Sequence, residues 1–166
     1  MDRGELSRAE IHASGYQVDE AVRCSFEVDV DQQTIAAVEE LLWGARPQVA
    51  ARFDCDIKGH EGAGFLRYLR GGFYRAHRDV IPELVVDFAR EIALVLFLTT
   101  ARTPDEPGDC EGGALRLYVP ATDASGVVAL DVPQVAGTLA AFPATVLHEV
   151  LPVTAGVRDV VVDWFY

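Results

Sequence analysis

The second half of the chain is a series of short apolar segments separated by turn-forming residues. From Gly64 onward, runs rich in Val, Leu, Ile and aromatic residues alternate with stretches rich in Gly, Pro and Asp. Many short strands at this spacing are typical of a β-sandwich or β-barrel, so the sequence predicts a mainly β fold. The strands that we expect are Phe65–Leu69, Phe73–Asp79, Ile92–Thr99, Ala114–Val119, Val127–Val132, Thr138–Phe142, Val146–Leu151 and Val157–Phe165.

A helical pattern precedes these strands. Asp31 can cap a helix that Gly44 ends. The apolar stripe of this helix consists of Ile35, Val38, Leu41 and Leu42. Pro47 suits the first turn of a shorter helix that reaches about Phe53.

The length of the chain indicates one domain. Its 166 residues fit a single core. Residues 1–20 are polar and weakly patterned, and Cys24–Val30 alternates enough to form a strand. We therefore expect a single domain over residues 1–166, with a helical layer at about 31–54 and a β core at about 64–166.

The composition excludes several classes of protein. Apolar residues make up 50% of the chain and charged residues 24%, which is neither a disordered nor a membrane-embedded composition. The net charge of −12 argues against binding to nucleic acids or to anionic membranes, because both require a basic surface. No apolar run approaches the ~18 residues of a membrane-spanning helix.

The N-terminus and the cysteines favour a cytoplasmic location. The first residues contain no apolar region of the kind found in secretion signals. The three cysteines, Cys24, Cys55 and Cys110, are widely spaced and form no C-x-x-C pair. We therefore expect neither a zinc ribbon nor a disulfide framework, and a reducing compartment is the default. The oligomeric state is left open.

His77-Arg78-Asp79 is the first candidate for chemistry. Residues i and i+2 of a strand point to the same face, so the His77 imidazole and the Asp79 carboxylate can converge on one metal ion. A surface histidine beside an aspartate gives the same pattern, and H-x-D by itself is weak evidence.

His148 is the second candidate, in the apolar segment Val146–Leu151. A histidine in such a strand can simply be a hydrogen-bonded core residue. Two histidines and one carboxylate, however, make a facial triad that leaves metal positions open, which is typical of non-haem Fe(II) oxygen chemistry.

Arg158 is the third candidate. If residues 152–156 form a turn, a hairpin centred on Val153 would place His148 opposite Arg158 on one face. A slip of one residue would break this arrangement. An arginine on a buried face needs an anion, which a ligand carboxylate can supply. A salt bridge with Asp163 or another acid is the alternative.

These pieces together resemble a known family. The stretches FLRYLRGGFYRAHRD, EGGALRLYV and GTLAAFPATVLHEVLPVTAGVRDVVVDWF, over roughly residues 64–166, are similar to the Fe(II)/2-oxoglutarate dioxygenases of the prolyl 4-hydroxylase-like branch. The order H-x-D, G-G-x-L, F-P and H-x-V-x-P-V, followed by G-x-R and W-F, is specific as a set.

The resemblance implies a fold, cofactors and site residues. The fold would be a double-stranded β-helix, a jelly-roll or cupin-like barrel with flanking N-terminal helices. His77, Asp79 and His148 would bind Fe(II), while Arg158 and Tyr68 would bind the co-substrate 2-oxoglutarate. O2 is the other substrate, and ascorbate is a further candidate cofactor. Phe97 stands where relatives often carry a co-substrate tyrosine.

The resemblance also narrows the reaction. Halogenating members replace the carboxylate ligand with a small residue, so Asp79 favours hydroxylation. Nucleic-acid demethylases carry a second arginine soon after the clamp, which this chain lacks. We expect hydroxylation of an aliphatic C–H bond in a prolyl or other amino-acid-like substrate, either a peptide or a small metabolite.

Substrate-binding residues are less well defined. Tyr74 matches a frequent aromatic residue near the iron of the family. Strand parity puts Arg75 on the face of His77 and Asp79, with Arg78 facing away, so Arg75 is the leading candidate to bind a carboxylate of the substrate. Further arginines near the motif are Arg67, Arg70 and Arg116, and each can instead pair with surface acids.

Several features leave alternatives open. His60 lacks ligand spacing and is interpreted as a loop residue. The polar segment 103–113 could be a lid over the site or a solvated connection. A cupin-like metalloenzyme that does not use 2-oxoglutarate, and a non-catalytic binding module of the same fold, are the competing functions.

Overall fold

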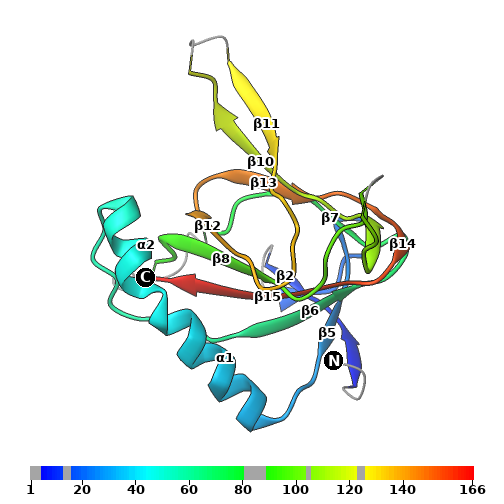
Figure 1. Ribbon diagram of the computed structural model, residues 1–166, viewed down its shortest axis with the longest axis horizontal. Coiled ribbons are helices and arrows are strands. Elements are labelled where there is room, and N and C mark those ends of the chain that lie inside the picture. The colour runs from blue at the N-terminus through cyan, green and yellow to red at the C-terminus, as the bar shows by residue number, and fades with distance from the viewer. Residues whose placement is uncertain (1–4, 13–15, 81–88, 104–105, 123–125) are drawn as a thin grey trace.

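Two β-sheets face each other and form the body of the molecule (Figure 1). The computed structural model describes residues 5–12, 16–80, 89–103, 106–122 and 126–166. The larger sheet has six strands in the order β1-β5-β6-β15-β8-β12, and the smaller has five in the order β11-β10-β13-β7-β4. The two sheets do not share a strand, so the predicted mainly β fold is confirmed but the barrel is not a closed one.

The strands of the larger sheet come from both ends of the chain. All neighbouring strands in this sheet run antiparallel. Its members are β1 (Leu6–Arg8), β5 (Phe26–Val28), β6 (Gly64–Tyr68), β8 (Ile92–Phe97), β12 (Leu139–Pro143) and β15 (Arg158–Phe165). The long strand β15 lies between β6 and β8, at the centre of the sheet.

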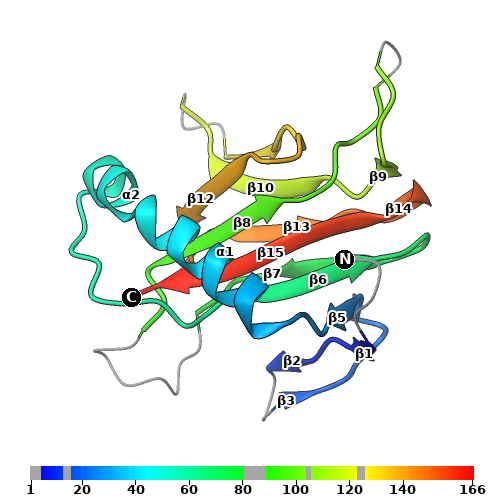
Figure 2. The same ribbon diagram turned by 60° about the horizontal axis from the view of Figure 1, so that its bottom comes forward.

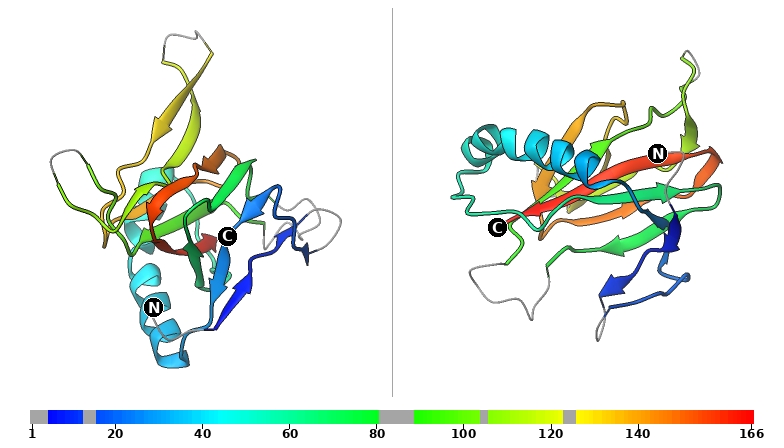
Figure 3. Two further views of the ribbon diagram at one scale, coloured as in Figure 1. Left: turned by 90° about the vertical axis from the view of Figure 1, so that its right-hand side faces the viewer. Right: turned by 90° about the horizontal axis from the view of Figure 1, so that it is seen from below.

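The smaller sheet and two short ladders complete the β structure. The smaller sheet contains β4 (Arg23–Cys24), β7 (Phe73–His77), β10 (Leu115–Pro120), β11 (Val127–Asp131) and β13 (Leu147–Val150). The short ladders join β2 (Ile11–His12) to β3 (Tyr16–Gln17), and β9 (Cys110–Gly112) to β14 (Val153–Gly156). The β10–β11 hairpin projects from the body of the molecule (Figure 3).

Alternation along β8 and β15 gives the larger sheet two apolar faces. Val95 and Val160 belong to the core between the sheets, whereas Leu96 and Val161 belong to a second core on the outer face. A strand that is buried on both faces appears as a continuous apolar run, which explains why Ile92–Phe97 contains no polar residue.

Two helices cover the outer face of the larger sheet, as Figure 2 shows. α1 (Gln32–Gly44) begins after Asp31, whose carboxylate accepts hydrogen bonds from the backbone and side chain of Thr34. Leu42 of α1 packs against the sheet. α2 (Arg46–Phe53) packs through Val49. In the described part of the chain, no helix is long and apolar enough to cross a membrane.

The strands expected from the sequence between residues 64 and 166 all exist, with boundaries that differ by one or two residues. The 103–113 segment was not expected to contain a strand, yet it contains β9. Residues 104–105 of this segment lie outside the described residues.

The hairpin expected between His148 and Arg158 is wrong. His148 pairs with Leu117 and His77 in the smaller sheet, whereas Arg158 pairs with Tyr68 in the larger sheet. The intervening residues are not a turn, because they form β14 and pair with β9. The chain therefore crosses from one sheet to the other, and the local sequence contains no sign of the distant partner strand that causes this.

The N-terminal residues, whose sequence is polar and weakly patterned, form the short strands β1 to β3. These strands cover one end of the space between the sheets. Ala9 is almost fully buried, and its N–H donates to the carbonyl of Ser25. The strand expected at Cys24–Val30 is divided into β4 and β5, which belong to different sheets.

Asp163 joins the segment before β6 to the centre of the larger sheet. Its side chain is fully buried and accepts hydrogen bonds from the backbone N–H groups of Gly62 and Trp164. The Nδ1 atom of His60 lies 2.8 Å from its other oxygen. His60, interpreted as a loop residue, is thus part of the connection that holds residues 59–62 on β15.

We predict that Asp163→Ala lowers the free energy of unfolding by about 2–4 kcal/mol, because it leaves buried donors without an acceptor. Urea unfolding followed by circular dichroism measures this change. Asp56→Ala, which removes an exposed carboxylate, is the control and should change the free energy by less than about 0.5 kcal/mol. Equal effects of the two substitutions would contradict the role given to Asp163.

Candidate functional site

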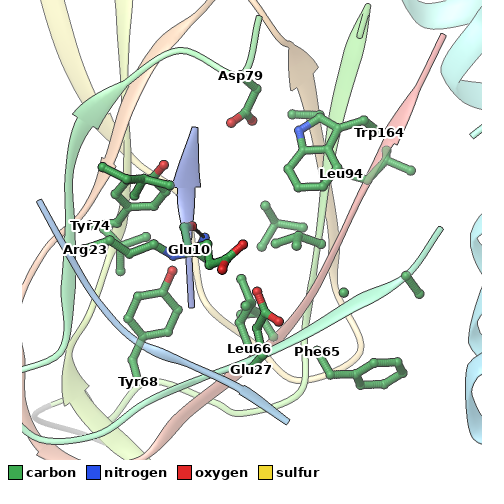
Figure 4. A pocket seen from close by; sticks show the side chains of 18 of the residues that line it. Glu10, Arg23, Glu27, Phe65, Leu66, Tyr68, Tyr74, Asp79, Leu94 and Trp164 are labelled. Carbon is green, nitrogen blue, oxygen red and sulfur yellow. Dashed lines mark hydrogen bonds between the residues drawn. The ribbon is translucent and has the colours of Figure 1, made fainter. Parts of the chain in front are cut away.

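A cavity of about 750 Å³ lies between the two sheets. Side chains from both sheets and from the N-terminal strands line it, and Figure 4 shows several of them directed into the open space. Those that bear on the chemistry are Tyr68, Tyr74, His77, Asp79, His148, Arg158 and Trp164.

His77, Asp79 and His148 come together at one side of this cavity. The Nε2 atoms of His77 and His148 each lie 3.5 Å from a different carboxylate oxygen of Asp79. One potential ligand atom from each residue falls within 4.8 Å of the others. His77 and His148 are direct partners across β7 and β13, while Asp79 follows the end of β7. The pairing of β7 with β13 in the smaller sheet therefore brings the two histidines and Asp79 together.

Backbone carbonyls hold both imidazoles with Nε2 directed at Asp79. The Nδ1 atom of His77 lies 2.8 Å from the carbonyl oxygen of Arg75, and that of His148 lies 3.0 Å from the carbonyl oxygen of Val146. Each Nδ1–H can donate to its carbonyl, which leaves Nε2 as the unprotonated atom. This is the common second hydrogen bond of a metal-binding histidine.

The electrostatics favour the charge states that a metal requires. Burial lowers the pKa of His148, although Asp79 opposes the effect, so the imidazole is neutral at pH 7. Burial alone would raise the pKa of Asp79, but the proximity of His77 and His148 brings it below its usual value. A carboxylate and two imidazoles with free Nε2 atoms suit a divalent transition metal.

Aromatic rings surround the cluster. The ring of Tyr74 stacks on His77 at a centroid distance of 3.6 Å, and Phe142 contacts His148 edge-on at 4.9 Å. Burial raises the pKa of Tyr74 to about 12, so its hydroxyl stays protonated. These contacts restrict the imidazoles and exclude water from one side of them.

Arg158 lies in the same cavity on the opposite sheet, and its burial is nearly complete, with 1% of the residue exposed. Its Nε donates to Gln134 at 3.1 Å, whereas its Nη1 is buried and has no hydrogen-bond partner among the described residues. A buried guanidinium without an acid is unfavourable. The unpaired donor indicates that Arg158 binds an anion that enters the cavity.

Tyr68 and Phe97 flank this guanidinium. Tyr68 is the strand partner of Arg158, with its ring centroid 4.9 Å from the guanidinium carbon, and Phe97 lies at 5.7 Å. The alternative pairing of Arg158 with Asp163 is not observed, because Asp163 bonds His60 and the backbone on the other face. The phenylalanine at position 97 forms part of the wall around the arginine.

Gly113 of the G-G-x-L motif leaves room for the arginine. A Cβ atom at this position would lie 2.9 Å from the Cδ of Arg158 and 2.9 Å from a methyl group of Val153. The backbone φ of +70° also disfavours any other residue. The motif is therefore a packing requirement of the buried arginine.

The expectation for Arg75 is wrong. Its Nε donates to the carbonyl oxygen of Ala21 outside the cavity, which Tyr74 lines instead. A bulge in the pairing of β7 with β13 is the reason, because it shifts the alternation between Tyr74 and His77. Arg78, expected to face away, borders the cavity and donates to the carbonyl of Thr145.

Arg116 also lies outside the cavity. It forms a bidentate pair with Asp131 across β10 and β11, with distances of 2.6 and 2.9 Å. Its neighbours Leu115 and Leu117 face the core. Arg67 makes a similar bidentate pair with Asp159. None of the described residues of the 103–113 segment lines the cavity, which argues against a lid there.

Sequence reasoning missed several lining residues. Trp164 shares the parity of Arg158, Val160 and Val162 along β15, which is a signal that could have identified it. Its Nε1 is buried without a hydrogen-bond partner among the described residues. Other residues gave no local signal, because distant segments bring them to the cavity or to Arg158. They are Glu10, Arg23, Glu27, Arg90 and Gln134.

Comparison with known proteins agrees with this geometry. The family described as the 2OG-Fe(II) oxygenase superfamily matches residues 63–166. A PKHD-type hydroxylase of Burkholderia ambifaria is 35% identical over 104 residues, which is 60% of this chain and 40% of the relative. One from a Picosynechococcus species is 36% identical over 100 residues. The chain thus spans about 40% of the length of these curated relatives.

Solved structures show the same fold. A Pseudomonas putida prolyl-4-hydroxylase superposes with a TM-score of 0.64 at 29% identity, over 97% of this chain and 77% of that one. A Trichoplax adhaerens prolyl hydroxylase, solved with a hypoxia inducible factor peptide fragment, gives 0.70 at 20% identity, over 97% and 70% of the two chains.

The family match covers more than half of the chain and includes every residue of the cluster and the buried arginine. The two sequence relatives are hydroxylases by name, and so is the Pseudomonas putida protein, which has the higher sequence identity of the two solved structures. The chain therefore belongs to the 2OG-Fe(II) oxygenase superfamily, in its prolyl 4-hydroxylase-like branch.

Proposed function

We propose that this protein is an Fe(II)- and 2-oxoglutarate-dependent dioxygenase that hydroxylates an aliphatic C–H bond. One observation carries the proposal. A His-Asp-His cluster and a buried arginine, whose Nη1 has no partner among the described residues, face the same cavity from opposite sheets. The cluster suits a metal ion with open positions, and the arginine suits the distal carboxylate of a bound acid.

The side chains have separate tasks in this reaction. His77, Asp79 and His148 would hold Fe(II), and Arg158 with Tyr68 would bind the far carboxylate of 2-oxoglutarate. The bound metal would supply the activation of O2 for the overall conversion of 2-oxoglutarate, O2 and a substrate C–H bond to succinate, CO2 and a hydroxylated product. The protein supplies ligation, orientation and exclusion of water.

The cavity walls support the exclusion of water. Leu66, Val95 and Val160 form an apolar floor in the core between the sheets. Tyr74 and Trp164 stand on opposite sides of the space below Asp79, as Figure 4 shows. A substrate held between these two rings would present its C–H bond to the metal side of the cavity.

We propose a prolyl or other amino-acid-like substrate, either in a peptide or as a free metabolite. The support comes from the relatives, whose names include prolyl-4-hydroxylase and PKHD-type hydroxylase. The cavity, with a volume of about 750 Å³, is large enough for a substrate beside the co-substrate.

Two alternatives remain distinguishable by experiment. A cupin-like metalloenzyme would need the cluster but would not need Arg158. A non-catalytic binding module would need neither metal nor 2-oxoglutarate. The complete cluster and the orphaned guanidinium both favour the dioxygenase.

We predict that His148→Ala weakens Fe(II) binding by more than about 100-fold and abolishes conversion of 2-oxoglutarate to succinate, because one metal ligand is lost. Anaerobic titration with Fe(II) and succinate detection measure the two effects. His60→Asn is the matched control, because it removes a histidine outside the cavity and can keep a donor to Asp163. Undiminished metal binding by His148→Ala would contradict its role as a metal ligand, and absence of Fe(II) binding by the unaltered protein would argue for a non-catalytic module.

We also predict that metal affinity is constant between about pH 8 and pH 7 and falls in acid. Protonation of the histidines competes with the metal, and burial lowers the pKa of His148, so it titrates below its usual 6.5. Asp79, with a pKa below 3.8, remains ionised throughout this range. Titration with Fe(II) at pH 7.5 and pH 5 tests this, and equal affinities would contradict histidine ligation.

We predict that Arg158→Ala leaves metal affinity within about twofold of the original but weakens 2-oxoglutarate binding at least thirtyfold, since truncating one partner of a buried charge pair costs about 2–5 kcal/mol. Calorimetric titration of the metal-loaded protein measures both values. Arg102→Ala removes an exposed, paired arginine and should change neither. An unchanged affinity for 2-oxoglutarate in Arg158→Ala would favour the cupin-like alternative.

A further inference from the structure

The cavity has an acidic wall that metal and co-substrate binding do not use. Glu10, next to β2, and Glu27, in β5, both line the cavity, and Figure 4 shows their carboxylates directed into it. Neither side chain makes a hydrogen bond or ion pair with another residue in the described part of the chain. Asp29 adds a third carboxylate to the same lining.

The cations near this wall are already engaged. Arg23 donates from Nε to Ser25 at 2.9 Å and from Nη1 to the backbone carbonyl of Glu10 at 2.6 Å, with its guanidinium above the ring of Tyr74. Arg90 is held by both carboxylate oxygens of Glu61 at 2.6 Å. Among the described residues, no arginine of the lining therefore forms a hydrogen bond or ion pair with the carboxylates of the acidic wall.

Independent observations show that this cavity is built to receive ligands. Arg158 Nη1 and Trp164 Nε1 are both buried, lack partners among the described residues and belong to the cavity lining. Groups of this kind are rare in proteins unless something else satisfies them. The exposed carboxylates of Glu10 and Glu27 line the same cavity as these two groups, at its solvent-accessible side.

Loading the site with cofactors does not neutralise the acidic wall. An Fe(II) ion, ionised Asp79, doubly charged 2-oxoglutarate and Arg158 together carry no net charge. The carboxylates of Glu10 and Glu27 consequently still face the space that remains for the substrate. Carboxylates that are not paired with a cation attract a cation and repel an anion at the mouth of a cavity, although exposure of Glu10 and Glu27 to solvent screens the effect.

We propose that Glu10 and Glu27 recognise a positively charged group of the substrate, an ammonium or guanidinium, and so select cationic amino-acid-like substrates. This inference rests on the proposed hydroxylase function and names the substrate class of that site. Both residues come from the N-terminal segment before the region that the superfamily match covers. The preference for a positively charged substrate would then come from the N-terminal segment of this chain.

Charge-matched probes test the proposal. The probes are acetylated, amidated dipeptides of proline followed by lysine, norleucine or glutamate, which differ in charge at similar length. Free L-lysine and free L-proline form a second arm that distinguishes a small amino acid from a peptide. Each is titrated by calorimetry, anaerobically, into protein loaded with Mn(II) and 2-oxoglutarate, so that binding is measured without turnover.

We predict that the lysine probe, or free lysine in the second arm, binds about tenfold more tightly than its neutral counterpart, as expected for a partly screened charge pair, and that glutamate binds least. The preference should shrink as salt is raised. The double variant Glu10→Gln/Glu27→Gln should reduce the preference to less than about twofold. Glu40→Gln, an exposed glutamate of α1 outside the cavity, is the matched control and should retain it.

The outcomes separate this inference from the function on which it rests. Failure to bind Mn(II) and 2-oxoglutarate would overturn the proposed function itself. Normal loading with equal binding of lysine and norleucine probes, or with no binding of any probe at millimolar concentration, would overturn only the charge selection. A preference for lysine that survives in the double variant would overturn the assignment to Glu10 and Glu27.

Discussion

The buried guanidinium of Arg158 is the constraint on which the arrangement of this protein depends. A charge with 1% exposure and an unpaired Nη1 can persist only where an anion reaches it. Gly113 makes room for its stem, Gln134 accepts from its Nε, and the rings of Tyr68 and Phe97 flank it. These contacts come from separate segments, so the strands around β15 are arranged to present one donor to a ligand.

The second half of the site belongs to the other sheet. His77 and His148 meet because β7 and β13 pair, and their Nδ1 atoms are fixed by backbone carbonyls. The separation of metal ligands and arginine onto facing sheets has a physical consequence. A ligand that spans the cavity contacts both sheets at once, so its binding should stabilise their relative position as well as satisfy the arginine.

The N-terminal segment closes this space and gives it a charge. Its residues Glu10, Arg23 and Glu27 belong to the lining, with both carboxylates exposed to solvent. The His-Asp-His half of the cavity and the acidic residues Glu10 and Glu27 come from different parts of the chain, so residues of the N-terminal segment can change without disturbing that cluster.

The sequence by itself determined the strands after Gly64, through alternation and turn residues, and its ordered motifs identified the metal cluster and the arginine as candidates. Only the tertiary structure decided how they meet. A local hairpin rule placed His148 opposite Arg158, but pairing of β14 with β9 sends the chain to the other sheet. Parity placed Arg75 in the site, but a bulge in β7 put Tyr74 there. Pairing between distant strands sets both outcomes, and no local pattern records which distant strand will be the partner.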